Sequence, residues 1–179
     1  RFERFWHWSQ AALLIFLMLT AFDIHGTLSI FGFEKAVAYH TTAAWTLIGL
    51  WLFAIFWHFT TGEWKQYIPT TEKVVAMMKY YLVGIFKHAP HPFKLTTLRK
   101  HNPLQRLAYL FILVCVGPLL WITGGLYLFY DKWPAWGLGG LPLEWVALGH
   151  TIGAFMMLAF LIAHVYLTTA GHTPLAHIK

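Results

Sequence analysis

The chain has 179 residues, of which 58% are hydrophobic and only 11% are charged, and its mean hydropathy is +0.55. Soluble domains carry about a quarter charged residues, so this composition excludes an ordinary soluble protein and predicts an integral membrane protein. The net charge of +6 does not indicate nucleic-acid binding, because the sequence offers no soluble fold on which a basic patch could lie.

Four apolar stretches are long enough to cross the hydrocarbon core of a bilayer, which needs about 20 helical residues. They predict an all-α fold, an integral membrane four-helix bundle that forms one domain over residues 1–179. No small-residue cleavage site follows the first stretch, so we expect a membrane helix there and not a cleaved signal peptide. Since the chain begins at Arg1 and not at Met, we expect a few residues to precede it. The predicted spans are Trp8–Ile24, Ala36–Phe59, Leu107–Phe129 and Trp145–Ala170.

The lysines and arginines predict how the spans are oriented. Eleven of the 13 lie in the N-terminal segment, in the long connection over residues 60–106 or at the C-terminus, and only Lys35 and Lys132 lie on the other side. Under the positive-inside rule, both termini and the long connection are therefore expected in the cytoplasm. The same charges favour contact with anionic membrane lipid.

One segment of the long connection has helical periodicity. Apolar residues recur at helical spacing through residues 71–87, TEKVVAMMKYYLVGIFK, which also contain three lysines. At 17 residues the segment is too short and too charged for a fifth span, so we predict an amphipathic helix at the membrane interface. Further along, Asn102 and Pro103 are typical of a helix start and introduce the third span.

The predicted spans contain histidines, but away from their ends they contain no lysine, arginine, aspartate or glutamate. His150 and His164 are 14 residues apart in the fourth span. That spacing gives about 21 Å of helical rise and falls roughly 40° short of four full turns, so the two side chains share a face. His40 and His58 in the second span are 18 residues apart, which is five turns, and they also share a face. His7 lies where the first span begins.

Two like-facing histidines near opposite ends of one span suggest two stacked metal or haem centres. A neutral imidazole avoids the cost of a buried charge, and iron can bind one ring nitrogen while the other ring N–H bonds a carbonyl. The alternative is four independent histidines that bond neighbouring helices, which four histidines at two matching depths disfavour. The single cysteine, Cys115, and the lack of a Cys-x-x-Cys-His motif exclude covalently attached haem.

Several motifs together resemble one known family. They are the His-x13-His pair of the fourth span, the His7–Trp8 opening of the first span, His40 at the start of the second, and the entry Lys-x-Asn-x-x-Gln-Arg to the third. In these motifs the chain resembles bacterial di-haem cytochrome b subunits. Members include the γ subunit of formate dehydrogenase-N, the b-type cytochrome of membrane nickel–iron hydrogenases and the thiosulfate reductase cytochrome b.

The resemblance implies two non-covalent b-type haems, each held by two histidines. His58 corresponds to no ligand of the family pattern and remains the alternative to His7 for the inner haem. Arg4 matches a family arginine and would pair with a haem propionate. The implied ligands are His40 and His150 for the periplasmic haem, and His7 and His164 for the cytoplasmic haem.

The resemblance also implies a quinone site on the cytoplasmic side, beside the inner haem. Asn102 matches the family's quinone-contacting asparagine, and Gln105 and Arg106 continue that segment. His101 could exchange protons with the quinone, since quinone reduction takes up two protons with two electrons.

The function that the resemblance implies is an electron-transfer subunit in a bacterial inner membrane, part of a hetero-oligomeric complex. It would pass electrons between a periplasmic redox partner and the quinone pool. A molybdenum enzyme with an iron–sulfur subunit, a hydrogenase or a multihaem c-type cytochrome would fit as partner, docked on residues 25–35 and 130–144.

Two alternatives to this function stay open. One is a stand-alone di-haem enzyme similar to superoxide:quinone oxidoreductases, and the other is a membrane anchor without cofactor.

Overall fold

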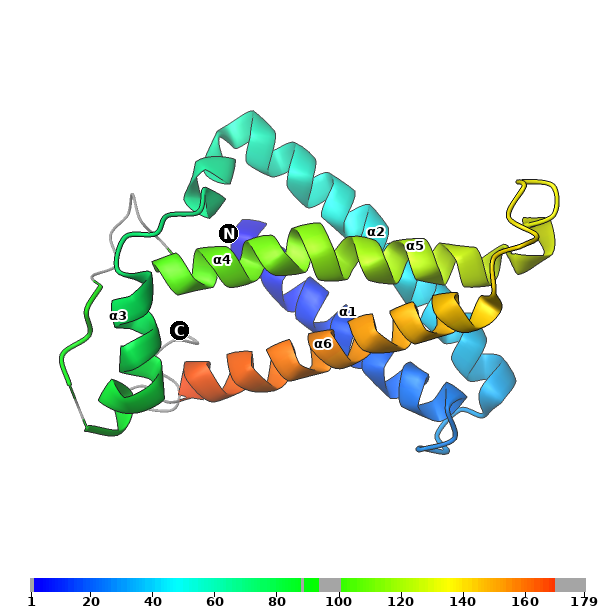
Figure 1. Cartoon of the computed structure of the whole chain (residues 1–179), viewed down its shortest axis with the longest axis horizontal. Coiled ribbons are helices and arrows are strands. Elements are labelled where there is room, and N and C mark those ends of the chain that lie inside the picture. The colour runs from blue at the N-terminus through cyan, green and yellow to red at the C-terminus, as the bar shows by residue number, and fades with distance from the viewer. Residues whose placement is uncertain (1, 88, 94–100, 170–179) are drawn as a thin grey trace. The chain divides into compact units, whose positions relative to one another are not determined.

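The computed structural model describes residues 2–87, 89–93 and 101–169, and over these residues the fold is all-α, with no β-strand (Figure 1). This confirms the predicted fold class. The chain divides into two compact units, Arg1–Trp64 and Lys65–Lys179. The organisation into a single domain stays a prediction.

The first unit is an antiparallel pair of helices, α1 (Phe2–Ile24) and α2 (Phe33–Thr61). A short turn joins them, so the end of α1 lies beside the start of α2 (Figure 1). Helix α2 ends at Gly62, whose φ of 77° is left-handed and therefore suits glycine.

Aromatic rings pack the two helices of the first unit together. Near the turn, the ring of Phe31 lies against Phe16 and Tyr39 at centroid distances of 6.0 and 5.3 Å. At the opposite end of the pair, the ring of Phe2 lies 4.4 Å from that of Trp57. These contacts fix the register of α1 against α2, because each pair joins residues far apart in the chain.

Asp23 holds the turn between α1 and α2. Its carboxylate accepts hydrogen bonds from the backbone N–H groups of Ile30, at 3.3 Å, and Phe31, at 2.6 Å. The side chain is buried, and a buried N–H group without a partner costs about 1–3 kcal/mol. One carboxylate therefore determines how the chain passes from the first helix to the second.

The second unit begins with a helical connection. A 3₁₀ turn covers Glu63–Tyr67, and α3 (Val74–Lys79) continues as a π-helical turn over Tyr80–Gly84 and a 3₁₀ turn over Ile85–Lys87. The structure is thus helical where the sequence predicts an amphipathic segment. Apolar side chains remain exposed along it, as an interfacial helix requires. The most exposed are Val75, Leu82 and Phe86.

A proline alters the geometry of the third long helix. Helix α4 (Pro103–Phe111) runs through a π-helical turn, Ile112–Val116, into α5 (Gly117–Leu128). Pro118 has no N–H to donate to the carbonyl one turn earlier. Directly before it, the N–H of Gly117 donates to the carbonyl five residues back, at Ile112. The widened turn therefore accompanies the proline.

Helix α6 (Leu143–Thr169) follows a 3₁₀ turn at Tyr130–Lys132 and packs antiparallel against α5 (Figure 1). Glycines allow this contact. A Cβ atom at Gly153 would lie 3.0 Å from the side chain of Leu120. Small residues at helix contacts are typical of membrane proteins, where close backbone approach replaces the hydrophobic effect.

In the part of the chain that the structure describes, four helical stretches are long and apolar enough to cross a membrane, which confirms the predicted number of spans. Each begins two to six residues earlier than predicted, because the polar and aromatic residues before each apolar stretch already belong to the helix. The stretches are Phe2–Ile24, Phe33–Thr61, Pro103–Leu128 and Leu143–Thr168.

The orientation of the spans stays a prediction. The orientation is predicted partly from basic residues that lie outside the described ones. Ala170, at the predicted end of the fourth span, also lies outside them. These basic residues are Arg1, Lys94, Arg99, Lys100 and Lys179.

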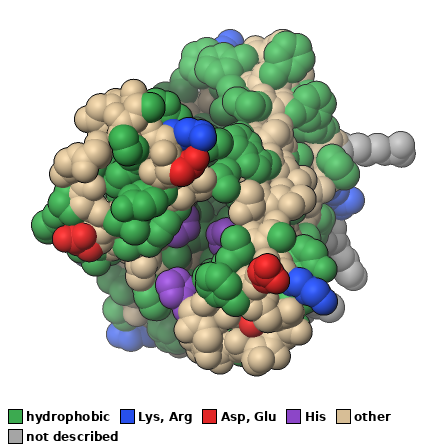
Figure 2. All heavy atoms as spheres, turned by 90° about the vertical axis from the view of Figure 1, so that its right-hand side faces the viewer, with side chains coloured by type: hydrophobic (Ala, Val, Ile, Leu, Met, Phe, Trp, Pro, Cys, Tyr) green, Lys and Arg blue, Asp and Glu red, His purple; other side chains and the backbone are tan. Residues whose placement is uncertain are grey.

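The surface of the spans suits lipid. Figure 2 shows the face on the right of Figure 1, where hydrophobic side chains are exposed among scattered acidic and basic ones. Phe56 is 64% exposed, Ile122 63% and Ile162 63%. Exposed apolar patches of this kind mark contact with a membrane or with another protein.

The carboxylate of Asp23 should be required for the turn of the first unit. We expect Asp23→Ala to destabilise the protein by about 1–3 kcal/mol, because two backbone N–H groups lose their acceptor. Unfolding of the detergent-solubilised protein by sodium dodecyl sulfate, followed by circular dichroism, measures the change. Glu34→Ala is the matched control, since Glu34 is an exposed acid at the start of α2. Equal stability of the two variants would contradict the role of Asp23.

Candidate haem-ligand and quinone residues

His40 is held by a hydroxyl from the neighbouring helix. Its Nδ1 lies 2.9 Å from the Oγ1 of Thr20, which comes from α1 and is fully buried. The same hydroxyl oxygen lies 3.0 Å from the backbone carbonyl oxygens of both Phe16 and Leu17, within its own helix. The contact ties the imidazole to the α1 backbone through one hydroxyl.

His150 has the same arrangement in the second unit. Its Nδ1 lies 2.9 Å from the Oγ1 of Thr123 on α5, and this hydroxyl lies 2.6 Å from the carbonyl oxygen of Leu119. Thr123 is also buried. We call these two contacts, Thr20 with His40 and Thr123 with His150, the threonine–histidine pairs.

The hydrogen bonds determine which nitrogen of each histidine carries the proton. A hydroxyl has one proton to donate, whereas a backbone carbonyl can only accept. The proton of Thr123 must lie toward Leu119, because two oxygens cannot approach to 2.6 Å without a proton between them. The lone pairs of the hydroxyl then accept from Nδ1–H of His150. The hydroxyl of Thr20 donates to the carbonyl oxygens of Phe16 and Leu17 at 3.0 Å, so its lone pairs are likewise left to accept from Nδ1–H of His40. The lone pair of each ring is therefore on Nε2.

The two pairs also occupy equivalent places in their units. His40 is seven residues beyond Phe33, where α2 begins, and His150 is seven residues beyond Leu143, where α6 begins. Each threonine lies close to the end of the preceding helix. Two helix pairs of unrelated sequence thus present a histidine about two turns from the turn that joins their helices.

Gly124 makes room for the ring of His150. A Cβ atom at this position would lie 3.3 Å from the Cε1 atom of the imidazole, a contact tighter than most. The ring of Tyr127 lies on another side, at a centroid distance of 6.1 Å. With His150 in this orientation, its ring leaves little space for a side chain larger than that of glycine at position 124.

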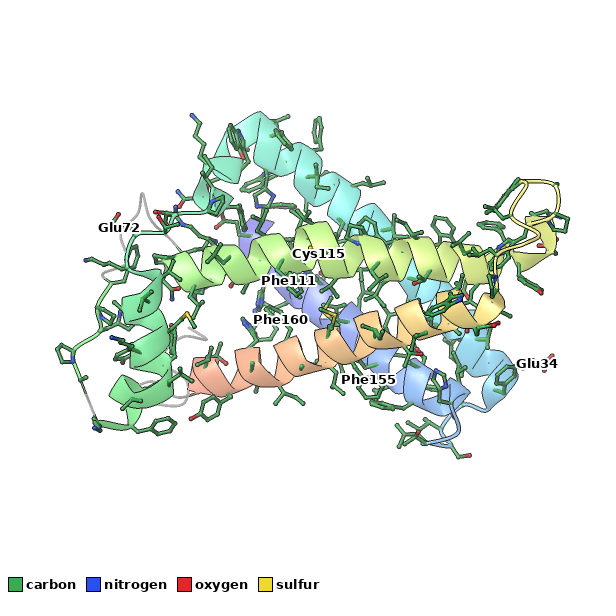
Figure 3. All side chains as sticks on the ribbon, viewed as in Figure 1. Glu34, Glu72, Phe111, Cys115, Phe155 and Phe160 are labelled. Carbon is green, nitrogen blue, oxygen red and sulfur yellow. The ribbon has the colours of Figure 1, made fainter. Side chains whose placement is uncertain are left out.

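His164 lies about four-fifths of the way along α6 and is half-buried. Its ring stacks on that of Phe160, one turn earlier, with centroids 5.6 Å apart and an angle of 22° between the planes. Figure 3 shows Phe160 on α6. The aromatic ring fixes the plane of the imidazole from within the same helix.

His7 and His58 differ in their surroundings. His7 is exposed near the start of α1, and its ring lies 5.3 Å from that of Trp8. His58 is buried, its Nδ1 lies 2.6 Å from the carbonyl oxygen of Ala54, and its ring contacts Trp6 at 5.2 Å. His58 is thus a packed residue between the two helices, whereas His7 is accessible. Arg4, one turn before His7, is also exposed.

Asn102 forms the N-cap of α4. Its Oδ1 accepts from the backbone N–H of Gln105 at 2.9 Å, and the Oε1 of Gln105 accepts from the backbone N–H of Asn102 at 3.0 Å. This reciprocal capping box satisfies two N–H groups of the helix start. The Nδ2 of Asn102 donates to the hydroxyl of Tyr81 at 3.0 Å. Burial raises the pKa of Tyr81, and the hydrogen bond from Asn102 partly offsets this effect.

His101 lies in an aromatic cluster next to the cap. Its ring is 5.2 Å from that of Tyr67 and 5.1 Å from that of Tyr109. Arg106 supports the same region, because its guanidinium donates to the carbonyl oxygens of His101 and Ile68, each at 3.2 Å. The structure thus brings all four predicted quinone residues to one helix start, where Asn102 and Gln105 bond mainly to each other.

Comparison with known proteins identifies the family. The model of the family described as prokaryotic cytochrome b561 matches residues 1–177. The chain belongs to this family. It is also 31% identical over 180 residues to "Putative cytochrome YdhU" of Escherichia coli (strain K12), a match that covers 96% of this chain and 67% of that protein. No solved structure matches the chain at a significant level.

Family membership confirms the resemblance that the histidine motifs suggested. The chain is a multi-pass membrane b-type cytochrome, which implies b-type haem and electron transfer. The family is that of the membrane cytochrome subunits of hydrogenase-type complexes. The pairs at His40 and His150 fit this chemistry, because an imidazole that donates through Nδ1 presents Nε2 to a metal.

Sequence reasoning did not find several residues around the cytochrome's histidines. The two threonines lie on helices other than those of their histidines, so no fixed spacing reveals them. A buried hydroxyl in an apolar span was the one available signal. The residues missed are Thr20, Thr123, Tyr67, Tyr81 and Tyr109.

Asn102 should contribute to stability through the cap. We expect Asn102→Ala to cost about 0.5–2 kcal/mol, the usual loss for an N-cap. Asn102→Asp is the control, because an aspartate still accepts from the N–H of Gln105 and its charge suits a helix N-terminus. The unfolding of both variants in detergent measures the difference. An alanine variant as stable as the aspartate variant would show that the cap is dispensable.

Proposed function

We propose that the cytochrome is an electron-transfer subunit that links a periplasmic redox partner to the quinone pool through two bis-histidine b-type haems. The observation that carries the proposal is the pair of matched threonine–histidine contacts, one in each unit. They hold two half-buried histidines in the tautomer that an axial ligand needs. Family membership supports the cofactor class.

His40 and His150 bind the periplasmic haem in this proposal. Both are about two turns from the start of their helices, and the starts of α2 and α6 lie on the same side of the membrane in the predicted topology. His7 and His164 bind the cytoplasmic haem, at the other ends of the spans, with Arg4 near a propionate. The haems, once bound, supply one-electron carriers near each membrane surface.

The surroundings of His7 and His58 favour His7 as the fourth ligand. His58 is buried between the two helices, and its ring is packed against Trp6. A porphyrin must lie against the ring edge of its ligand, which requires open space beside the imidazole. The exposed ring of His7 offers such space.

The quinone site lies at the start of α4 in this proposal. Asn102 and Gln105 hold the backbone of the segment through their capping box, and the Tyr81 hydroxyl buttresses Asn102. His101 is the residue best suited to exchange a proton with a quinone oxygen, and Arg106 fixes its backbone. One quinone takes up two electrons and two protons and becomes a quinol. Delivery of electrons from the periplasm with proton uptake from the cytoplasm would build membrane potential, and the reverse direction would dissipate it.

The partner docks on the turns over residues 25–35 and 130–144 in this proposal. The second turn exposes Trp136 and Leu141, which suit a protein contact or the membrane surface. A molybdenum enzyme with an iron–sulfur subunit, a hydrogenase or a multihaem c-type cytochrome has the required chemistry. Family membership supports an assembly of this kind, because the family supplies the membrane cytochrome of hydrogenase-type complexes.

A stand-alone superoxide:quinone oxidoreductase is the second candidate. It needs a cationic entrance for an anionic substrate on the periplasmic side. Lys132 is one of two basic residues there, and its Nζ forms a 2.7 Å ion pair with Asp131. This pairing weakens the attraction for an anion and favours the subunit over the stand-alone enzyme.

Histidine variants test the haem ligands. The purified cytochrome should show a reduced b-type spectrum with two haems per chain, and His40→Ala and His150→Ala should each lose the same haem. His7→Ala and His164→Ala should lose the other. Haem stoichiometry with a redox titration identifies which haem remains. His58→Ala is the matched control and should keep both haems. A His58 variant with one haem beside a His7 variant with two would reverse the assignment, and a spectrum without b-type haem would overturn it.

A substitution at His101 tests the quinone site. We expect His101→Ala to slow reduction of the haems by a quinol analogue about a hundredfold, because a positioned proton acceptor is lost. Stopped-flow absorption measures the rate, and reduction by dithionite shows that both haems remain. His91→Ala is the control, since His91 is an exposed histidine of the same connection. An unchanged quinol rate in the His101 variant would remove this residue from the site.

A further inference from the structure

We infer that Thr20 and Thr123 are a matched pair of positioning residues that set the reduction potential of one haem, the one bound by His40 and His150. The inference rests on the proposed ligand assignment. Each hydroxyl accepts a hydrogen bond from Nδ1–H of one axial histidine. This hydrogen bond changes how strongly Nε2 of the same ring donates electrons to iron.

The geometry gives each hydroxyl a defined role. Each hydroxyl donates its proton to a backbone carbonyl of its own helix, at 2.6 Å for Thr123 with Leu119 and at 3.0 Å for Thr20 with Phe16 and Leu17. The hydroxyl oxygen therefore accepts from the histidine and cannot donate to it. A hydroxyl whose proton is already bonded is a better acceptor, because hydrogen bonds in a chain polarise one another. Each ring is thus connected to a helix backbone through two successive bonds.

An acceptor at Nδ1–H raises the basicity of the imidazole. A more basic ligand stabilises ferric iron relative to ferrous iron and lowers the reduction potential. Both ligands of the same proposed haem carry this acceptor, so their effects act in one direction on one cofactor. The ring of His164, a ligand of the other proposed haem, stacks on Phe160. Because both threonines act on the haem of His40 and His150, they shift its potential relative to that of the other haem.

A purely structural role is the competing explanation. Buried threonines commonly bond a carbonyl one turn earlier, and under this explanation each threonine serves only to pack a helix pair. The two explanations differ in a measurable quantity. Loss of packing weakens the protein and both haem sites without preference. Loss of an acceptor at Nδ1 changes the potential of one haem in a predictable direction.

Valine and serine variants distinguish them. Valine has the shape of threonine without the hydroxyl, and serine keeps the hydroxyl. Thr20→Val, Thr123→Val and the double variant are compared with Thr20→Ser and Thr123→Ser in the purified holoprotein. Potentiometric titration followed by optical spectroscopy resolves the two haems, and electron paramagnetic resonance reports the ligand field of each. Haem-binding assays measure affinity.

We expect each valine variant to shift the midpoint potential of one haem to a more positive value, the same haem that His40→Ala loses. The second haem should keep its potential, and the double variant should show about the sum of the two shifts, because the threonines act on different ligands. Affinity for the shifted haem should fall about tenfold to a hundredfold. Serine variants should behave as the wild type.

Several outcomes would overturn the inference. They are unchanged potentials in valine variants that retain both haems, equal shifts of both haems, and serine variants that behave like valine variants. If the double valine variant loses the haem, each single valine variant still reports the potential of that haem in the fraction of molecules that retain it. Failure of the ligand assignment is separate, because His40→Ala and His150→Ala would then keep both haems whatever the threonine variants show.

Discussion

Inside a membrane no water satisfies the N–H of a buried imidazole, and an unsatisfied polar group there costs several kcal/mol. This constraint governs the arrangement of the cytochrome's central histidines. Each pair solves it with a hydroxyl from a neighbouring helix, which in turn bonds a carbonyl of its own backbone. The same hydrogen bonds place the proton of each imidazole on Nδ1. The need to satisfy a buried N–H group thus gives each histidine the tautomer that the proposed role as a haem ligand requires.

The same constraint links the fold to the cofactor. A threonine can reach its histidine only if the two helices of a unit pack in one register, which the aromatic contacts near Phe16 and the glycine contact at Gly153 maintain. In the first unit, the carboxylate of Asp23 holds the turn between the helices. In the second unit, the packing of Leu120 on Gly153 holds α5 close to α6. In each unit, the packing of the two helices therefore also determines the orientation of the histidine.

Periodicity explains how much the sequence could predict. The spans, the helical connection and the shared face of His150 and His164 follow from local spacing, which depends on one helix at a time. The choice of Thr123 as the partner of His150 depends on how two helices are rotated against each other, and no spacing within one helix contains that information. The role of Asp23 could not be predicted from the sequence for a similar reason. Read along the chain it is a polar residue at the end of a span, whereas its function as a backbone acceptor depends on the path of the turn.

The start of α4 shows how a recognisable motif can serve structure and chemistry at once. The side chains of Asn102 and Gln105 bond to each other's backbone, so their first effect is to begin a helix at a fixed residue. Arg106 then connects that start to the carbonyl oxygen of Ile68, which lies next to Tyr67. As a result, the ring of His101 lies beside Tyr109 of the helix that follows it and beside Tyr67, which is 34 residues earlier in the chain. In the proposed quinone site, the motif Asn102 to Gln105 therefore acts mainly by positioning the neighbouring His101.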